Sequence, residues 1–203
     1  MNKTLRTAAA AAGFAFAVSA VPAAATTDCS PGKPGSELTL EEGKKVYDCI
    51  KDALYAGYMK GDKKWIPAEY VRDYRDWTPV STGPANPGWH GERFLLTFVN
   101  DVGAEEYLKY LEERGPMPAG TVIAKESFSV KDEGKVKKGP LFFMVKVEAG
   151  SAPETADWNY MLVSPGGKPM KINAQKACSA CHEDNFGARD GLGYPIEEVR
   201  VGQ

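Results

Sequence analysis

The chain has 203 residues, and its 25 lysines and arginines nearly balance its 27 aspartates and glutamates, for a formal net charge of −2 at pH 7. This balance gives no support for nucleic acid or an anionic membrane surface as a partner. The length suits one domain with a sizeable core, and the chain has no internal repeats or long low-complexity tracts.

The first 25 residues have the features of a secretory signal peptide. Lys3 and Arg6 form a short basic region, an alanine-rich apolar run extends from Ala8 to Val21, and three alanines at 23–25 suit a cleavage site. No later stretch is apolar enough to span a bilayer. We therefore expect residues 1–25 to be removed and the mature protein to be soluble in the bacterial periplasm, where disulfides form.

The next predicted element is a long helix over residues 40–60, within an N-terminal extension that we place at residues 26–69. Thr39 and Glu42 have the spacing of a capping box at its start, and Gly61 suits its end. Apolar residues recur every four positions and form one stripe for the core: Val46, Ile50, Leu54 and Tyr58.

Beyond this helix the pattern changes to short strands. We predict strands over residues 93–99, 121–130, 141–148 and 158–164, with a second helix over 104–114 and a charged loop over 131–139. In that helix Tyr107, Leu108 and Leu111 are expected to face inward. Strands in meander order, with helices at the start and in the middle, indicate an α+β fold with an antiparallel sheet rather than an all-helical protein.

The most informative motif lies close to the C-terminus, where Cys178, Cys181 and His182 form the C-x-x-C-H signature of covalent c-type haem attachment. The two thiols can each bond to a haem vinyl group, and the adjacent imidazole ligates the iron. A zinc knuckle or a redox dithiol also uses C-x-x-C. The histidine directly after the second cysteine, in an exported chain, favours haem. We predict one haem c held by these three residues.

The two remaining cysteines are Cys29 and Cys49. In an oxidising compartment we expect a disulfide between them, which would tie the start of the mature chain to the first helix. The alternative is a second haem site at Cys49, because the preceding residues 43–48 resemble the entry to a small cytochrome c motif. However, residues 50–53 read Ile-Lys-Asp-Ala and supply neither the second cysteine nor the histidine.

Four stretches of the chain resemble the cytochrome P-460 and cytochrome c′-beta family. They are Tyr74–Val80, Met117–Glu126, Asp157–Trp158 and Lys176–His182. The Gly-Thr-Val phrase at 120–122, followed by Lys-Glu at 125–126, is the most specific, because its order and its distance from C-x-x-C-H also fit. The resemblance covers most of the mature chain, so we treat residues 70–203 as a haem domain.

The resemblance implies an antiparallel sheet that carries one haem, usually in a homodimer, with His182 as the proximal iron ligand and the opposite iron face open to small ligands. In the P-460 branch, a lysine of the Gly-Thr-Val-x-x-Lys-Glu strand is bonded to the porphyrin, and the protein oxidises hydroxylamine. In the c′-beta branch that bond is absent, and the protein binds nitric oxide or carbon monoxide. A periplasmic electron-transfer protein is the expected redox partner.

Lys125 occupies the position of that lysine. A lysine in a strand is usually a solvated charge, but the motif match favours proximity to haem. By alternation Ile123 and Lys125 share the face turned to the porphyrin, whereas Glu126 points to the opposite face and is interpreted as structural. We expect Lys125 to decide between the two branches.

The sixth iron position separates two classes of function, because a six-coordinate electron-transfer cytochrome needs a second strong ligand. His90 is the only other histidine, and we interpret it as a loop residue with a distal hydrogen-bonding role alongside Arg93 rather than as a ligand. The candidate thioethers stand in no typical axial setting: Met117, Met144, Met161 and Met170. We therefore expect an open distal site. Phe94, Phe98 and Phe128 could give it an apolar wall, although aromatic residues on strands are more often part of the core. No distal base is evident, which weakens the case for hydroxylamine oxidation relative to nitric oxide binding, and we keep both activities as candidates.

Overall fold

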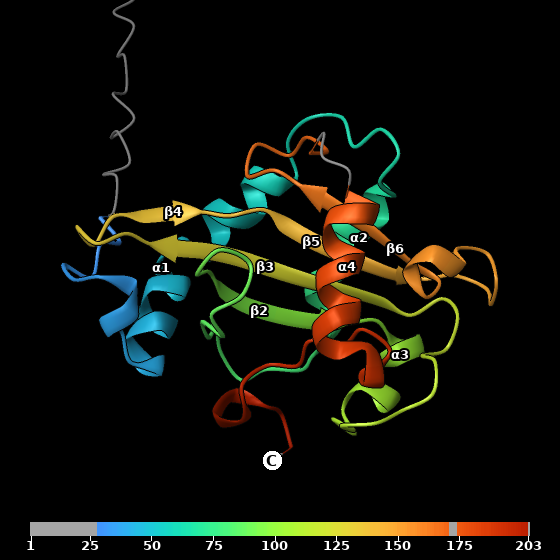
Figure 1. The fold of residues 1–203 in the computed structure, drawn as a ribbon. Helices are drawn as coiled ribbons and strands as arrows, with labels where there is room; N and C mark the ends of the chain where they lie inside the picture. Colours follow the sequence, from blue (N-terminus) through green and yellow to red (C-terminus); the bar gives the residue numbers. More distant parts are fainter. Residues whose placement is uncertain (1–27, 171–173, 203) are drawn as a thin grey trace, which may run out of the picture.

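The computed structural model describes residues 28–170 and 174–202, so the predicted signal peptide lies outside the described residues. The chain forms one antiparallel sheet in the order β1-β2-β3-β5-β6, and β4 pairs with the outer part of β3 (Figure 1). The strands are β1 Thr78–Pro79, β2 Phe94–Val99, β3 Val122–Val130, β4 Val136–Lys138, β5 Leu141–Lys146 and β6 Trp158–Val163. The predicted α+β fold with an antiparallel meander is confirmed.

Four α-helices accompany the sheet in the part of the chain that the structure describes. They are α1 Leu40–Tyr58, α2 Ala68–Asp73, α3 Asp101–Tyr107 and α4 Ala174–Phe186. The predicted capping box starts α1, because the Thr39 hydroxyl accepts from the Glu42 backbone and the Glu42 carboxylate accepts from the Thr39 backbone. None of these helices has the length and apolar character needed to cross a membrane.

Two predicted elements differ from the structure. The helix expected over residues 104–114 begins at Asp101 and ends at Tyr107, because Tyr110 takes a positive φ of 44° that breaks the helix. Leu111 consequently is 41 % exposed rather than inward. The loop expected over 131–139 contains β4, since Gly134, with φ 77°, allows a tight turn that returns the chain along β3.

The sheet is covered on both faces, and all nine residues of β3 are buried. On one face α1 packs against aromatic side chains of β2, β3 and β5. On the other face lies a second core with Ile123, Met144, Trp158 and Tyr160, over which α4 runs (Figure 1). Phe94, Phe98 and Phe128 belong to the α1 core, so they are core residues and do not form the apolar wall that was considered for the distal site.

Candidate functional site

The C-x-x-C-H motif lies on α4, which had not been predicted as a helix. Cys178 and Cys181 are three residues apart and therefore lie on the same side of the helix. Cys178 is half-buried against the second core, Cys181 is exposed, and both thiols are free in the structure. His182 is buried, with 7 % of its surface exposed. One turn of helix thus presents two accessible thiols beside a buried imidazole.

His182 is fixed in the tautomer that a metal ligand needs. Its Nδ1 lies 2.7 Å from the carbonyl oxygen of Gly191. A carbonyl only accepts hydrogen bonds, so Nδ1 carries the proton and Nε2 keeps its lone pair. Burial lowers the pKa of His182 to about 4, with the charge of Lys125 adding to the effect. The ring is therefore neutral at neutral pH, as iron ligation requires.

A cavity of about 230 Å³ lies between α4 and the sheet, and we call it the main cavity because the C-x-x-C-H residues line it, although others are larger. Its sheet side is formed by two rows of paired residues, one from each of three adjacent strands: Lys125, Phe142 and Leu162, and Ile123, Met144 and Tyr160. Its helix side is formed by Cys178, Cys181 and His182. The register of β3, β5 and β6 therefore brings an apolar surface opposite the motif.

Lys125 is the one charged side chain that the sheet contributes to this cavity among the described residues. The side chain is buried, with 7 % exposed, and its Nζ donates to the carbonyl oxygen of Gly193 at 2.9 Å. Burial lowers the pKa of Lys125 to about 8. A larger fraction of this amine is therefore neutral than in an exposed lysine, so it can accept a proton or act as a nucleophile. Ile123 shares this face, as the alternation predicted.

His90 also lies in the main cavity, carried by a loop with an unusual backbone. Gly88, His90, Gly91 and Glu92 all have positive φ, which is uncommon for the two residues that are not glycine. The His90 ring stacks on Phe142 at 4.6 Å between centroids and lies 6.2 Å from the ring of His182. Its Nδ1 is buried and finds no hydrogen-bond partner in residues 28–170 and 174–202, and burial lowers the pKa of His90 to about 3. A buried polar atom of this kind points to an interaction that the protein alone does not supply.

Arg93 does not line the main cavity; its guanidinium instead donates to the carbonyl of His90 and so fastens the loop. Of the four methionines considered as ligands, Met144 and Met161 line the cavity, whereas Met117 is buried in the second core. Glu126 lies on the opposite face, where it is 1 % exposed and bonded to Tyr47, Tyr74 and Arg75. This placement agrees with a structural role for Glu126.

A family model described as Cytochrome P460 matches residues 71–192, which is more than half of the chain. The chain belongs to the cytochrome P460 family. Among curated proteins, no relative matches it. The matched region includes Lys125, the C-x-x-C-H motif and Gly191, so the whole geometry around His182 lies within it. Membership of the cytochrome P460 family implies a c-type haem protein, and haem is therefore its cofactor.

The residues present fit a haem of this family. The donor set contains two thiols and a neutral imidazole with a free Nε2, and the facing surface is apolar apart from Lys125 and His90. Sequence analysis did not identify the carbonyls of Gly191 and Gly193 as partners of His182 and Lys125. Every residue has a backbone carbonyl, so no residue type marks these two. Phe142 and Tyr160 were also not identified as cavity residues. Phe142 could not be assigned to a face from its strand alone, because residues 141–145 are all apolar and show no alternation.

Proposed function

We propose that this member of the cytochrome P460 family is an exported protein with one covalently attached haem, which acts on a small nitrogen species at an open iron site. The observation that carries the proposal is the main cavity, where the C-x-x-C-H residues of α4 face the buried amine of Lys125. Cys178 and Cys181 would hold the haem through thioether bonds, and Nε2 of His182 would ligate the iron.

A haem bound there supplies an iron that takes a small uncharged ligand on its free side and exchanges electrons. The chain supplies the surroundings. Ile123, Phe142 and Met144 make an apolar wall that excludes water, and this favours an uncharged diatomic such as nitric oxide. The carbonyl of Gly191 holds the proton on Nδ1 of His182, which keeps the imidazole oriented.

Hydroxylamine oxidation makes a further demand, because the substrate loses protons as it loses electrons. Beside His182, the described cavity residues include two nitrogen bases, Lys125 and His90. With a pKa of about 8, most of the Lys125 amine is protonated at pH 7 and can donate a proton, whereas the His90 ring, with a pKa of about 3, is neutral and can accept one. The electrons would pass to a periplasmic electron-transfer protein. Lys125 also separates the hydroxylamine-oxidising branch from the gas-binding branch in this proposal, because the matching lysine of the family is bonded to the porphyrin in the first branch and not in the second.

A six-coordinate electron carrier is the second candidate, and one observation favours it. The rings of His90 and His182 are 6.2 Å apart, which is close enough for both imidazoles to face one metal ion, and Nδ1 of His90 has no hydrogen-bond partner among the described residues. In that case His90 would occupy the iron position that the first candidate leaves free.

Export to the periplasm is part of the proposal. It rests on the leader features of residues 1–25 and on the disulfide between Cys29 and Cys49, a bond that persists in oxidising compartments. The boundary at residue 70 between an extension and a haem domain stays a prediction. A homodimer is proposed from the family resemblance, and sedimentation of the haem-loaded protein tests it.

The deciding experiment is an absorption spectrum of the haem-loaded protein, oxidised and reduced, with and without nitric oxide, together with its intact mass. The mass should rise by one haem, and Cys178→Ala/Cys181→Ala should abolish that rise. A high-spin spectrum that shifts with nitric oxide supports gas binding. A strongly red-shifted ferrous Soret band with a haem–Lys125 peptide supports hydroxylamine oxidation. A sharp low-spin spectrum that ignores nitric oxide would support the electron carrier instead.

A further inference from the structure

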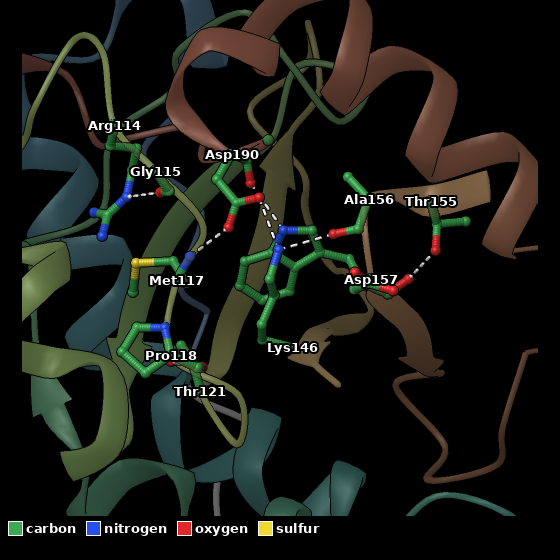
Figure 2. Close-up of polar contacts among 12 residues, drawn as sticks. Arg114, Gly115, Met117, Pro118, Thr121, Lys146, Thr155, Ala156, Asp157 and Asp190 are labelled. Atoms are coloured by element: carbon green, nitrogen blue, oxygen red, sulfur yellow. Dashed lines mark hydrogen bonds and ion pairs between the residues drawn. The ribbon is translucent and has the colours of Figure 1, made fainter. Parts of the chain in front are cut away.

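Lys146 and Asp190 form a buried ion pair close to His182, in addition to the pair of Arg75 and Glu126 on the other face of the sheet. Nζ of Lys146, at the end of β5, is 2.7 Å from Oδ1 of Asp190 in the C-terminal segment (Figure 2). Their side chains are 4 % and 8 % exposed. Asp190 directly precedes Gly191, the residue whose carbonyl accepts from His182. The pair therefore stands one peptide unit away from the hydrogen bond that orients the proposed iron ligand.

Asp190 is held by three separate parts of the chain. Besides Lys146, the backbone N–H of Met117 donates to Oδ2 at 2.7 Å (Figure 2). The indole Nε1 of Trp158 donates to the Asp190 carbonyl at 2.8 Å. These bonds fix the side chain and the backbone of one residue at the same time.

The bonds from Lys146, Met117 and Trp158 to Asp190, which we call the clamp, hold a backbone conformation that the chain does not prefer. Asp190 has φ 55° and Gly191 has φ 75°, so two successive residues are in the left-handed region. A residue with a side chain adopts that conformation at some cost, and it persists only where the surroundings determine it. The two successive left-handed residues turn the chain back toward α4 and direct the Gly191 carbonyl at Nδ1 of His182.

A gain in folding stability does not explain why Lys146 and Asp190 are charged residues in a buried position. A buried ion pair contributes little net stability compared with an apolar pair of similar volume, because both ions lose their hydration. Lys146 satisfies its remaining protons by donating to the carbonyl of Ala156 at 2.8 Å and by lying 4.9 Å from the centre of the Trp158 ring. The polar groups of Lys146 and Asp190 all have partners, and their hydrogen bonds have defined directions. This is expected of residues that hold a neighbouring group in one position.

We propose that Lys146 and Asp190 are positioning residues that press the Gly191 carbonyl against Nδ1 of His182 and so set how strongly His182 donates electrons to the iron. The inference rests on the proposed function, since it takes His182 as the iron ligand. A strong hydrogen bond at Nδ1 makes an imidazole more basic, and a more basic ligand favours ferric over ferrous iron. Loosening the clamp therefore raises the reduction potential of the haem.

The test compares Lys146→Met, Asp190→Asn and Trp158→Phe with the wild type in the haem-loaded protein. The readouts are the midpoint potential and the frequency of the iron–histidine stretch in the ferrous state. Loss of positioning lowers that frequency and raises the potential in all three variants, by about tenfold in the redox equilibrium, or 59 mV for one electron. For Lys146→Met the loss of a charge alone would have the opposite effect on the midpoint potential, because removing a positive charge near the haem lowers it.

Asp184→Asn is the matched charge control. It removes one exposed acid on α4 near the motif, and it should leave the iron–histidine frequency unchanged. If Lys146→Met lowers the potential, or if the frequency is unchanged in the folded variants, the inference is wrong. Trp158→Phe removes a neutral hydrogen bond and leaves the charges in place, although it also shortens a buried ring beside Lys146. It decides the question if the charge variants do not fold. A wild-type protein without covalent haem would instead overturn the proposed function.

Discussion

Nδ1 of His182 lies 2.7 Å from the carbonyl oxygen of Gly191. Two residues further along, the carbonyl of Gly193 accepts from Nζ of Lys125 at 2.9 Å. One short C-terminal segment therefore fixes both a side chain of α4 and a side chain of β3. Because these bonds join the helix side and the sheet side of the main cavity, the conformation of this segment controls the geometry of the whole site.

Gly191→Ala tests this control. Gly191 has φ 75°, and an added Cβ would lie 3.8 Å from Cβ of His182, so the strain comes from the backbone rather than from a clash. We expect a loss of about 1 kcal/mol in the free energy of unfolding, measured by urea denaturation. Gly187→Ala is the control, since Gly187 has no positive φ and open space around it. Equal stability of the two variants would contradict the assigned role of Gly191.

Lys125→Met should change how stability depends on pH in haem-free protein carrying Cys178→Ala and Cys181→Ala. Burial lowers the pKa of Lys125 from 10.5 to about 8, so the unfolded chain binds more protons than the folded chain between these values. Stability contributed by this site therefore rises as pH increases from 8 to 10.5. Below pH 8 the buried charge costs about 3 kcal/mol. Lys125→Met should be the more stable protein at pH 7, with its advantage shrinking above pH 8.

Thermal unfolding between pH 7 and pH 11 checks this expectation. Lys137→Met is the matched control, because Lys137 is an exposed lysine on β4. Its difference from the parent protein should be small and nearly independent of pH. A Lys125→Met advantage that stays constant across the range would show that the amine is not desolvated in the folded protein.

The faces of β3 were predictable, because successive residues of a strand point to opposite sides. This rule put Ile123 and Lys125 together and Glu126 opposite, as observed. The same rule shows why the expected distal wall failed. Phe128 is three residues from Lys125, an odd number, so the two side chains cannot share a face. Apolar residues occur on both faces of this sheet, and their pattern alone does not say which face receives the haem.

The part that the C-terminal segment plays in the site could not be predicted from its residue types. The partners of His182 and Lys125 are backbone carbonyls, whose positions depend on the turn at Asp190 and Gly191. Asp190 itself is an ordinary residue in the sequence, and its partner Lys146 lies 44 positions away. A glycine that follows an aspartate indicates a turn. It does not indicate which side chain the turned carbonyl will meet.

Arg75→Met should destabilise the core on the opposite face of the sheet. Arg75 pairs with Glu126 at 2.6 Å, and Glu126 is 1 % exposed, so the substitution leaves a buried carboxylate without its cation. We expect a loss of about 3 kcal/mol in the free energy of unfolding. Arg72→Met is the control, since Arg72 makes an exposed pair with Asp73 and should show little change. Similar losses in both variants would argue against a structural role for the buried pair.

Reduction of the disulfide between Cys29 and Cys49 should also lower stability. The bond closes a loop of 20 residues and ties the start of the described chain to α1. For a loop of this size the loss is about 3 kcal/mol, mainly through greater freedom of the unfolded chain. Cys29→Ser/Cys49→Ser should unfold at the same urea concentration with and without a reductant, whereas the wild type should be sensitive to it. An insensitive wild type would mean that the bond does not form in solution.

His90→Ala should open the distal side of the haem-loaded protein without changing its coordination. The ring stacks on Phe142 inside the main cavity, and we expect an incoming ligand to displace it. Breaking such a contact costs on the order of 1 kcal/mol, and its removal should speed carbon monoxide association by about fivefold. His90→Phe refills the space without a nitrogen and should bind at the wild-type rate. The two variants share the same strained φ at position 90, so backbone effects cancel. If both variants instead convert a low-spin spectrum to a high-spin one, the nitrogen of His90 is the sixth ligand, and the electron-carrier assignment replaces the open site.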